Sequence, residues 1–164
     1  MGAAALATVF FAGGCSFSVG SSDSVTKPDD AAPGTCVSLS GTDAKNMTVK
    51  KVSCDGGTEL TFYSAGTIAK TGKCATADYT TLSFPDTDTQ LCMALNMAQG
   101  SCYQINPNDI ADYRRIDCGT AGKAGTSVYK VASRTDGTAS CTTGQQAVDY
   151  TQPKAIGYCL EAAG

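Results

Sequence analysis

Two stretches of this 164-residue chain match each other: Gly34-Thr35-Cys36-Val37 and Gly100-Ser101-Cys102-Tyr103. Each combines a glycine, a hydroxyl residue, a cysteine and an apolar residue, and each opens a set of four cysteines. The first set comprises Cys36, Cys54, Cys74 and Cys92, and the second comprises Cys102, Cys118, Cys141 and Cys159. Recurrence after about 66 residues predicts a duplication, because a fixed period is the sequence signature of repeated structural units.

Further correspondences support the duplication. In each half a β-branched residue lies two positions before the second cysteine, and an aromatic residue and an alanine lie twelve and nine positions before the third. The matching pairs are Val52 and Ile116, Phe62 and Tyr129, and Ala65 and Ala132. The tripeptide Asp-Tyr-Thr also recurs, at 78–80 and 149–151, but its distance from the last cysteine differs by four residues. We therefore predict two similar modules, at 34–98 and 99–164.

The composition of both modules is typical of β-strands. Threonine, valine and tyrosine are abundant, glycines separate short segments, and no segment has apolar residues at helical spacing over three turns. We therefore expect an all-β fold, in which a short helical turn near each third cysteine is compatible with the pattern. The expected strands span 35–40, 47–54, 59–68, 77–84 and 89–96 in the first module, and 101–106, 113–118, 127–134, 147–151 and 156–161 in the second.

The eight cysteines of the modules are best explained as disulfides. Modules of about 65 residues gain only marginal stability from a hydrophobic core, and closing a loop of about 18 residues contributes roughly 3 kcal/mol. A zinc site is disfavoured because the chain has no histidine and no Cys-x-x-Cys pair. The density of cysteine also indicates a compartment outside the cytoplasm.

A hairpin of the first two strands in each module favours pairing of the first cysteine with the second and of the third with the fourth. In such a hairpin Cys36 lies opposite Cys54 around a turn near residues 44–45, and Cys102 lies opposite Cys118 around Ile110. The other two favoured bridges are Cys74–Cys92 and Cys141–Cys159. Pairing of the first cysteine with the fourth and of the second with the third is the alternative, since it would tie the ends of each module together.

The ninth cysteine, Cys15, stands apart from both sets. It follows fourteen uncharged residues that end in the small residues Ala12-Gly13-Gly14, and this segment resembles the signal peptide and lipobox of bacterial lipoproteins. That pattern usually has leucine where Ala12 stands and a basic start, so we expect the natural start to lie further upstream. The resemblance implies a signal peptide at 1–14 and a lipid-modified Cys15. An ordinary secretory segment with an unpaired Cys15 is the alternative, although an odd thiol in an oxidising compartment needs its own explanation.

Residues 15–33 are expected to form a lipidated, flexible tether. Serine, glycine, proline and aspartate dominate 16–33, and apolar periodicity is absent. Such a segment buries too little surface to offset the entropy cost of ordering, and linker scaling gives it a mean reach of about 20–25 Å. The predicted order is therefore a signal peptide, a lipid anchor, a tether and two modules.

The modules also resemble a known family. The motifs that carry the resemblance are the Gly-x-Cys-Val opening at 34–37, the segments that end in Cys54 and Cys118, the strand Val128-Tyr129-Lys130-Val131 and the closing Tyr158-Cys159-Leu160. Together with the anchored N-terminus, they are similar to the LppU-type lipoproteins of actinobacteria over residues 34–164. The resemblance implies a small extracytoplasmic protein of the cell envelope, of unsettled biochemical role, with no catalytic residues to carry over.

The sequence offers little for catalysis. Without histidine, the commonest general base and metal ligand is missing, and no Ser/His/Asp or Cys/His set can form. The paired carboxylates Asp86-Thr87-Asp88 and Asp29-Asp30 lie beside prolines, where solvated charges are the simpler explanation. The glycine-rich stretch 119–126 lacks the spacing of a phosphate-binding loop. We therefore expect no enzymatic activity, no cofactor and no metal.

Charge argues against nucleic acid as a partner. Twelve Lys and Arg against fifteen Asp and Glu give a net charge of −3, and no basic patch is evident in the sequence. The pairs Lys50-Lys51 and Arg114-Arg115 occupy matching places in the two modules. One member of each pair is expected to face solvent on an edge strand, where charge discourages aggregation; an anion contact is the alternative.

Two classes of function fit these observations. The preferred one is a non-catalytic binding or structural module, anchored to the membrane, whose partner is an envelope protein or a glycan. The alternative is a secreted inhibitor or small enzyme-like factor with an unrecognised active loop, for which 85–88 is the first candidate. Binding through an aromatic patch would require exposed tyrosines, and the candidates are Tyr103, Tyr113, Tyr129 and Tyr150.

Mass spectrometry of the mature protein tests both assignments of the cysteines. Because the eight cysteines of the modules should be fully paired, reduction should add eight hydrogen atoms to the intact mass. Free thiols in either set would contradict the disulfide prediction. The N-terminal peptide should begin at an acylated Cys15, and an unmodified N-terminus would contradict the anchor.

Overall fold

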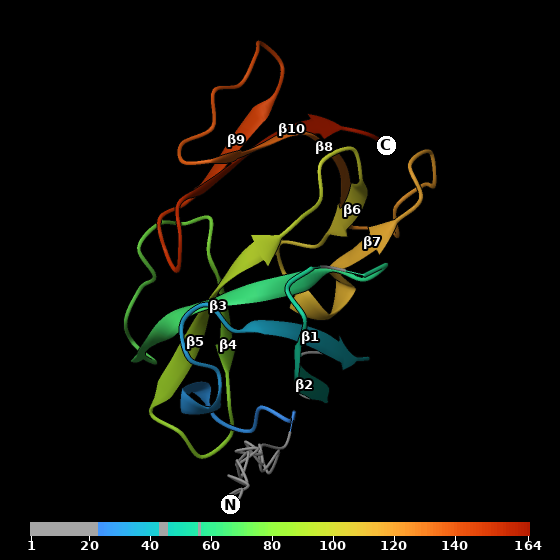
Figure 1. The fold of residues 1–164 in the computed structure, drawn as a ribbon. Helices are drawn as coiled ribbons and strands as arrows, with labels where there is room; N and C mark the ends of the chain where they lie inside the picture. Colours follow the sequence, from blue (N-terminus) through green and yellow to red (C-terminus); the bar gives the residue numbers. More distant parts are fainter. Residues whose placement is uncertain (1–22, 43–45, 56) are drawn as a thin grey trace, which may run out of the picture.

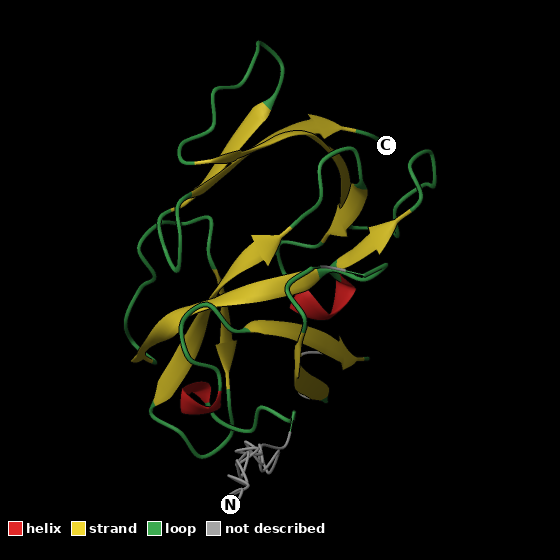
Figure 2. Cartoon of the chain, viewed as in Figure 1, coloured by secondary structure: helices red, strands yellow, loops and turns green. Residues whose placement is uncertain are grey.

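The computed structural model of this chain describes residues 23–42, 46–55 and 57–164. Within them the chain forms two five-stranded antiparallel sheets, one in each module, with almost no helix (Figure 1 and Figure 2). The predicted signal peptide, Cys15 and the first part of the tether lie outside the described residues. In the part of the chain that is described, no helix is long and apolar enough to cross a membrane.

The two sheets have the same topology. The first consists of β1 (Cys36–Gly41), β2 (Met47–Val52), β3 (Thr61–Ala69), β4 (Thr80–Ser83) and β5 (Thr89–Asn96). The second consists of β6 (Cys102–Ile105), β7 (Arg114–Ile116), β8 (Ser127–Asp136), β9 (Gln146–Tyr150) and β10 (Ile156–Ala162). Their spatial orders are β2-β1-β3-β5-β4 and β7-β6-β8-β10-β9, so each strand of the second sheet has a counterpart in the first. The all-β prediction is confirmed.

Helical structure among the described residues is limited to two 3-10 turns, η1 (Pro28–Asp30) and η2 (Ile110–Asp112). Neither lies beside a third cysteine, because Cys74 and Cys141 are in irregular connections between strands. The helical turn near each third cysteine that the sequence pattern allowed is therefore not formed. In η2 the local cause is Asp109, whose side chain accepts a hydrogen bond from the backbone N–H of Ala111.

The alanines that match in the two halves mark a β-bulge in each module. Ala65 in β3 is skipped in the pairing with β5, beside Cys92. Ala132 in β8 is skipped in the same way in the pairing with β10, beside Cys159. An extra residue in one strand bends it and increases the local twist, so the two sheets bend at corresponding positions.

Four disulfides have the pairing that the hairpin argument favours: Cys36–Cys54, Cys74–Cys92, Cys102–Cys118 and Cys141–Cys159. The strand register differs from the expected one by two residues, because Cys36 lies opposite Val52 and Cys102 lies opposite Ile116. A shift of two residues keeps a side chain on the same face of a sheet. The second cysteine, just beyond the strand, therefore still reaches the first.

Residues 23–33, expected to belong to the flexible tether, pack against the first sheet instead. Asp23 accepts a hydrogen bond from the N–H of Lys51 at 2.6 Å, and the N–H of Val25 donates to Val49 at 2.9 Å. Ser24 thereby pairs with Lys50 at the outer edge of β2.

Buried side chains fix the rest of this segment. Val25, Pro28 and Ala31 are buried, and the Ser64 hydroxyl of β3 donates to the carbonyl of Ala31 at 2.7 Å. Composition does not predict these contacts, because the segment has only three buried apolar residues and no periodicity. Three such residues are enough to fix the segment because the first sheet offers a free edge for backbone hydrogen bonds and an apolar face for the side chains.

The two sheets share one hydrophobic core. Tyr158 of β10 is fully buried, and its hydroxyl donates to the carbonyl of Leu95 at 3.0 Å and accepts from the N–H of Met97 at 3.2 Å. Arg134 of β8 donates to the carbonyl of Met97 at 2.7 Å and to the side-chain oxygen of Asn96 at 3.0 Å. Its guanidinium lies over the Tyr158 ring, 5.7 Å from the ring centre. The end of β5 is therefore held by side chains of the second sheet.

The repeated Asp-Tyr-Thr tripeptides form a second contact between the modules. The Tyr79 hydroxyl, just before β4, accepts from the N–H groups of Thr151 and Gln152 at 2.8 and 2.7 Å. The Tyr150 hydroxyl, at the end of β9, donates to the carbonyl of Asp78 at 3.1 Å, and the two tyrosine rings meet edge to face with centres 5.0 Å apart. The tripeptides hold different positions in their sheets, in keeping with the four-residue offset in the sequence.

Alkaline pH should weaken the contact between the modules through Tyr158. Burial of its hydroxyl raises the pKa of Tyr158 from 10.0 to about 12. A phenol whose pKa is higher in the folded chain stabilises the fold below the unfolded pKa, and this contribution, about 2–3 kcal/mol for such a shift, is lost as pH rises toward the folded pKa. The free energy of unfolding in urea should therefore fall as pH rises from about 10 to about 12.

Tyr158→Phe is the matched control, because it removes the titrating hydroxyl and keeps the ring. At neutral pH this variant should lose about 1 kcal/mol of stability, since Met97 and Leu95 each lose a partner. Burial also raises the pKa of Tyr150, so a smaller alkaline loss should persist in the variant. Equal alkaline slopes in the two proteins would contradict the role of Tyr158.

Candidate binding groove between the modules

The segment between β6 and β7 brings the second module against the first sheet. Tyr113 follows η2 and stacks on Phe62 of β3, with ring centres 6.4 Å apart. Desolvation raises the pKa of the Tyr113 hydroxyl. The duplicated backbone explains the position of this segment, since it occupies the place of the β1–β2 turn in the first module.

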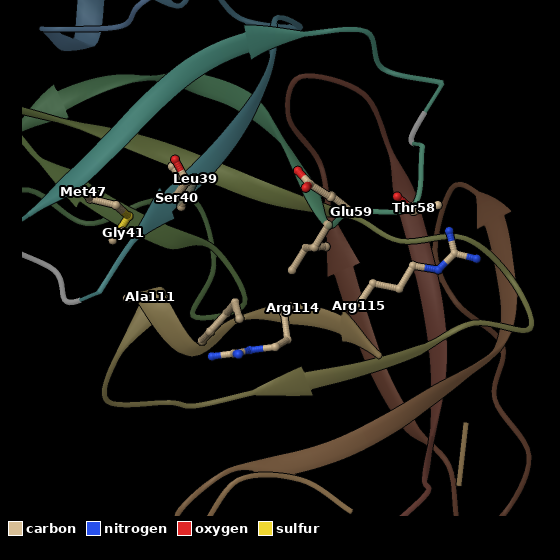
Figure 3. A pocket seen from close by; sticks show the side chains of 11 residues that line it. Leu39, Ser40, Gly41, Met47, Thr58, Glu59, Ala111, Arg114 and Arg115 are labelled. Atoms are coloured by element: carbon tan, nitrogen blue, oxygen red, sulfur yellow. The ribbon is translucent and has the colours of Figure 1, made fainter. Parts of the chain in front are cut away.

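An open groove of about 330 Å³ runs beside this segment (Figure 3). One wall comes from the first module, through the β1–β2 hairpin and the residues before β3, and the other comes from η2 and β7. The apolar lining includes Leu39, Met47, Leu60 and Tyr113, and the charged lining comprises Glu59, Arg114 and Arg115. The groove therefore exists only because the two modules are joined.

Arg114 belongs to a small charge network on the β7 wall. Its guanidinium lies 3.0 Å from a carboxylate oxygen of Asp112, and the ammonium of Lys123 lies 2.8 Å from the same oxygen. Hydrogen bonds from Lys123 and then from Asn106 hold the pKa of Asp112 below its ordinary 3.8. Two cations share one carboxylate, so this wall carries a positive surplus, and the Arg114 side chain is 52% exposed.

Arg115 spans from β7 to the first module. Its guanidinium donates to the carbonyl of Gly57 at 3.0 Å. In Figure 3 it extends toward Thr58, whereas Arg114 points toward Ala111, as expected for neighbours on a strand. A further hollow of about 300 Å³, lined by Thr58, Arg115, Ile116 and Asp117, continues the groove along β7.

A second hollow, of about 500 Å³, lies on the other side of Tyr113. Its polar lining includes Asp78, before β4, and Asp109, after β6. The Asp78 carboxylate accepts from the N–H of Asp149, and that of Asp109 accepts from Ala111. Both carboxylates therefore hold backbone in place, which favours a structural role for them.

The fold separates the four tyrosines that were candidates for an aromatic patch. Tyr103 and Tyr150 are each 2% exposed. Tyr113 and Tyr129 are half-buried, and of the four only Tyr113 lines the groove. A binding patch made of all four is therefore excluded.

The two basic pairs do occupy matching positions in the sheets. Lys50 lies opposite Ser38, and Arg114 lies opposite Gln104, at the outer edges of β2 and β7. As expected, one member of each pair, Lys50 and Arg114, is exposed, and its neighbour is half-buried. Sequence reasoning found the arginines but missed the groove, because its opposite wall comes from residues of the other module.

The other sequence candidates serve local turns. The Asp30 carboxylate accepts from Thr26 and Lys27 around η1, and these hydrogen bonds, first that of the Thr26 backbone, lower the pKa of Asp30. Asp86 has a φ of 57°, and the adjacent Thr87 hydroxyl donates to the carbonyls on either side of its turn. In the glycine-rich stretch 119–126, the N–H of Lys123 donates to the Gln104 side chain at 2.8 Å.

Neither a metal site nor a known relative indicates what the groove binds. Within residues 23–42, 46–55 and 57–164, no group of three or more His, Cys, Asp or Glu side chains is placed to hold a metal ion. No family model, no curated protein and no solved structure matches this chain. The function of the groove must therefore be argued from its geometry.

Asp112→Asn should loosen the β7 wall of the groove, because it removes the charge that Arg114 and Lys123 share. A carboxylate whose folded pKa is lowered stabilises the fold above its unfolded pKa, and this contribution is lost as pH falls through the folded pKa. The variant should therefore melt at a lower temperature than the wild type at neutral pH, and the difference should disappear in acid.

Asp117→Asn, on the exposed loop after β7, is the control and should leave the melting temperature unchanged. A wild-type melting temperature for Asp112→Asn at neutral pH would show that the network does not hold this wall.

Proposed function

We propose that this chain is a lipid-anchored extracytoplasmic protein whose two modules form one non-catalytic binding body in the cell envelope. The observation that carries the proposal is the joining of two disulfide-bonded sheets around an open groove that both line. Duplication thus supplies one composite site rather than two equal ones. The partner is an envelope protein or a glycan, with no nucleic acid involved.

The location of the folded part follows from its disulfides. Four disulfides in a chain of this size are typical of an oxidising, extracytoplasmic environment. The lipid anchor at Cys15 rests on the sequence alone, through the resemblance to the lipobox and to LppU-type lipoproteins. The packed segment 23–33 supports a short link between that anchor and the first sheet.

The chemistry of the groove favours binding over catalysis. Its arginines are held by Asp112 and by the carbonyl of Gly57, and histidine is absent from the sequence. The alternative, a secreted inhibitor or enzyme-like factor, needs a reactive loop. The candidate turn at 85–88 has its hydroxyl committed to internal hydrogen bonds.

Capture from crosslinked cell envelopes tests the proposal. The full-length protein should fractionate with membranes and crosslink to one major envelope component, whereas Cys15→Ala should be released into the soluble fraction. The released variant should still bind the same component when it is added back to envelopes, because the groove is intact. Membrane association that survives Cys15→Ala would refute the anchor, and the lack of any saturable component would refute the binding role.

A further inference from the structure

The structure provides an internal example of strand addition at the edge of the first sheet. The outward carbonyl of Val49 accepts from the N–H of Val25, and the outward N–H of Lys51 donates to the carbonyl of Asp23. Ser24 lies opposite Lys50 in antiparallel orientation. An extended segment thus completes β2 through main-chain hydrogen bonds alone, while Val25 buries its side chain.

The corresponding edge of the second sheet is open. By register, Arg114 takes the place of Lys50, so the carbonyl of Tyr113 and the N–H of Arg115 take the places of the two outward groups. Among the described residues no backbone hydrogen bond reaches either group. The edge lines the groove and its continuation, through residues 113–115 and 115–117.

We propose that β7 binds an extended peptide segment of another protein, which adds antiparallel to its open edge as residues 23–25 add to β2. Strand addition gives affinity through main-chain hydrogen bonds and specificity through alternate side chains. The inference rests on the proposed binding function and names the partner as a polypeptide rather than a glycan.

The lining of the groove defines the side chains of this segment. An apolar residue in the position of Val25 meets Leu39, Met47 and Leu60 on the opposite wall. An acidic residue in the position of Ser24 lies across from Arg114 and meets the positive surplus of Arg114 and Lys123 around Asp112. We therefore expect an acidic residue followed directly by a β-branched or other apolar residue, in the places of Ser24 and Val25.

Selection of random phage-displayed peptides on the purified, oxidised protein, followed by affinity measurement with the enriched peptide, tests this proposal. Arg115→Pro removes the outward N–H and should weaken binding by about tenfold or more, since proline is tolerated on an edge strand whose N–H faces outward. Arg115→Ala removes the same side chain but keeps the N–H, so it is the reference, and Arg115→Pro should bind the peptide about tenfold or more weakly than Arg115→Ala. Lys51→Pro, the matched change in β2, should leave peptide affinity unchanged.

Amide hydrogen exchange on the wild-type protein gives a result that does not depend on the stability of a variant. The Lys51 amide, bonded to Asp23, should be protected with and without peptide. The Arg115 amide should exchange fast in the free protein and slowly in the complex. Fast exchange of Arg115 in the complex would overturn the proposal.

Other outcomes would also overturn it: no enriched peptide, equal affinity of Arg115→Pro, or a dimer of this chain that Arg115→Pro dissolves, since the occupant would then be a second copy. Envelope capture separates this failure from that of the proposed function. If wild type and Arg115→Pro capture the same component equally, binding stands and the β7 site falls. If neither captures anything, the binding function itself falls.

Discussion

The docking of Arg134 and Tyr158 on the end of β5 is the contact on which the rest of the molecule depends. The Tyr158 hydroxyl donates to the carbonyl of Leu95, near the end of β5, and Arg134 donates to the carbonyl of Met97, in the short link between the sheets. Desolvation lowers the pKa of Arg134, but the Tyr158 and Tyr63 hydroxyls outweigh it and raise the pKa overall. The half-buried guanidinium therefore takes part of its hydrogen bonding from the protein itself. This contact joins the two sheets, and together with the Phe62–Tyr113 stack and the Arg115–Gly57 hydrogen bond it holds β7 beside the first module, where the groove lies.

The two sheets share one backbone topology, and the contact between them depends on side chains that differ between the two modules. Arg134 and Tyr158 are cross-strand neighbours in the second sheet, and Thr67 and Leu91 are the neighbours at the same places in the first. A threonine and a leucine in the first sheet thus correspond to an arginine and a tyrosine in the second. The same asymmetry separates the edges: β2 is completed by the chain's own residues, whereas the described residues leave β7 open.

Much of this fold was predictable from cysteines and short strands, because both are local signals. The all-β class, the two modules and most strand bounds follow from strand-favouring composition and turn residues, whereas the bulges at Ala65 and Ala132 were not predicted, although the two alanines were noted as a match. What the sequence could not reveal depends on contacts between distant residues. The burial of Tyr103 and Tyr150, the packing of 23–33 and the wall opposite Arg115 all require knowing how one sheet lies on the other. Arg114 and Arg115 were visible as a repeated pair, but their different surroundings were not.

The pairing of residues 23–25 with β2 would have a mechanical consequence if the chain is held at the anchor proposed at Cys15. A pull on that anchor would load the hydrogen bonds of Asp23 and Val25 with β2 before it loaded the sheets themselves. Unravelled, residues 23–33 would span at most about 36–40 Å. Unravelling would then stop at Cys36, since the bond to Cys54 closes the next strands into a loop that tension cannot open. Residues 23–33 would thus extend under force, while the strands closed by the Cys36–Cys54 disulfide would stay folded.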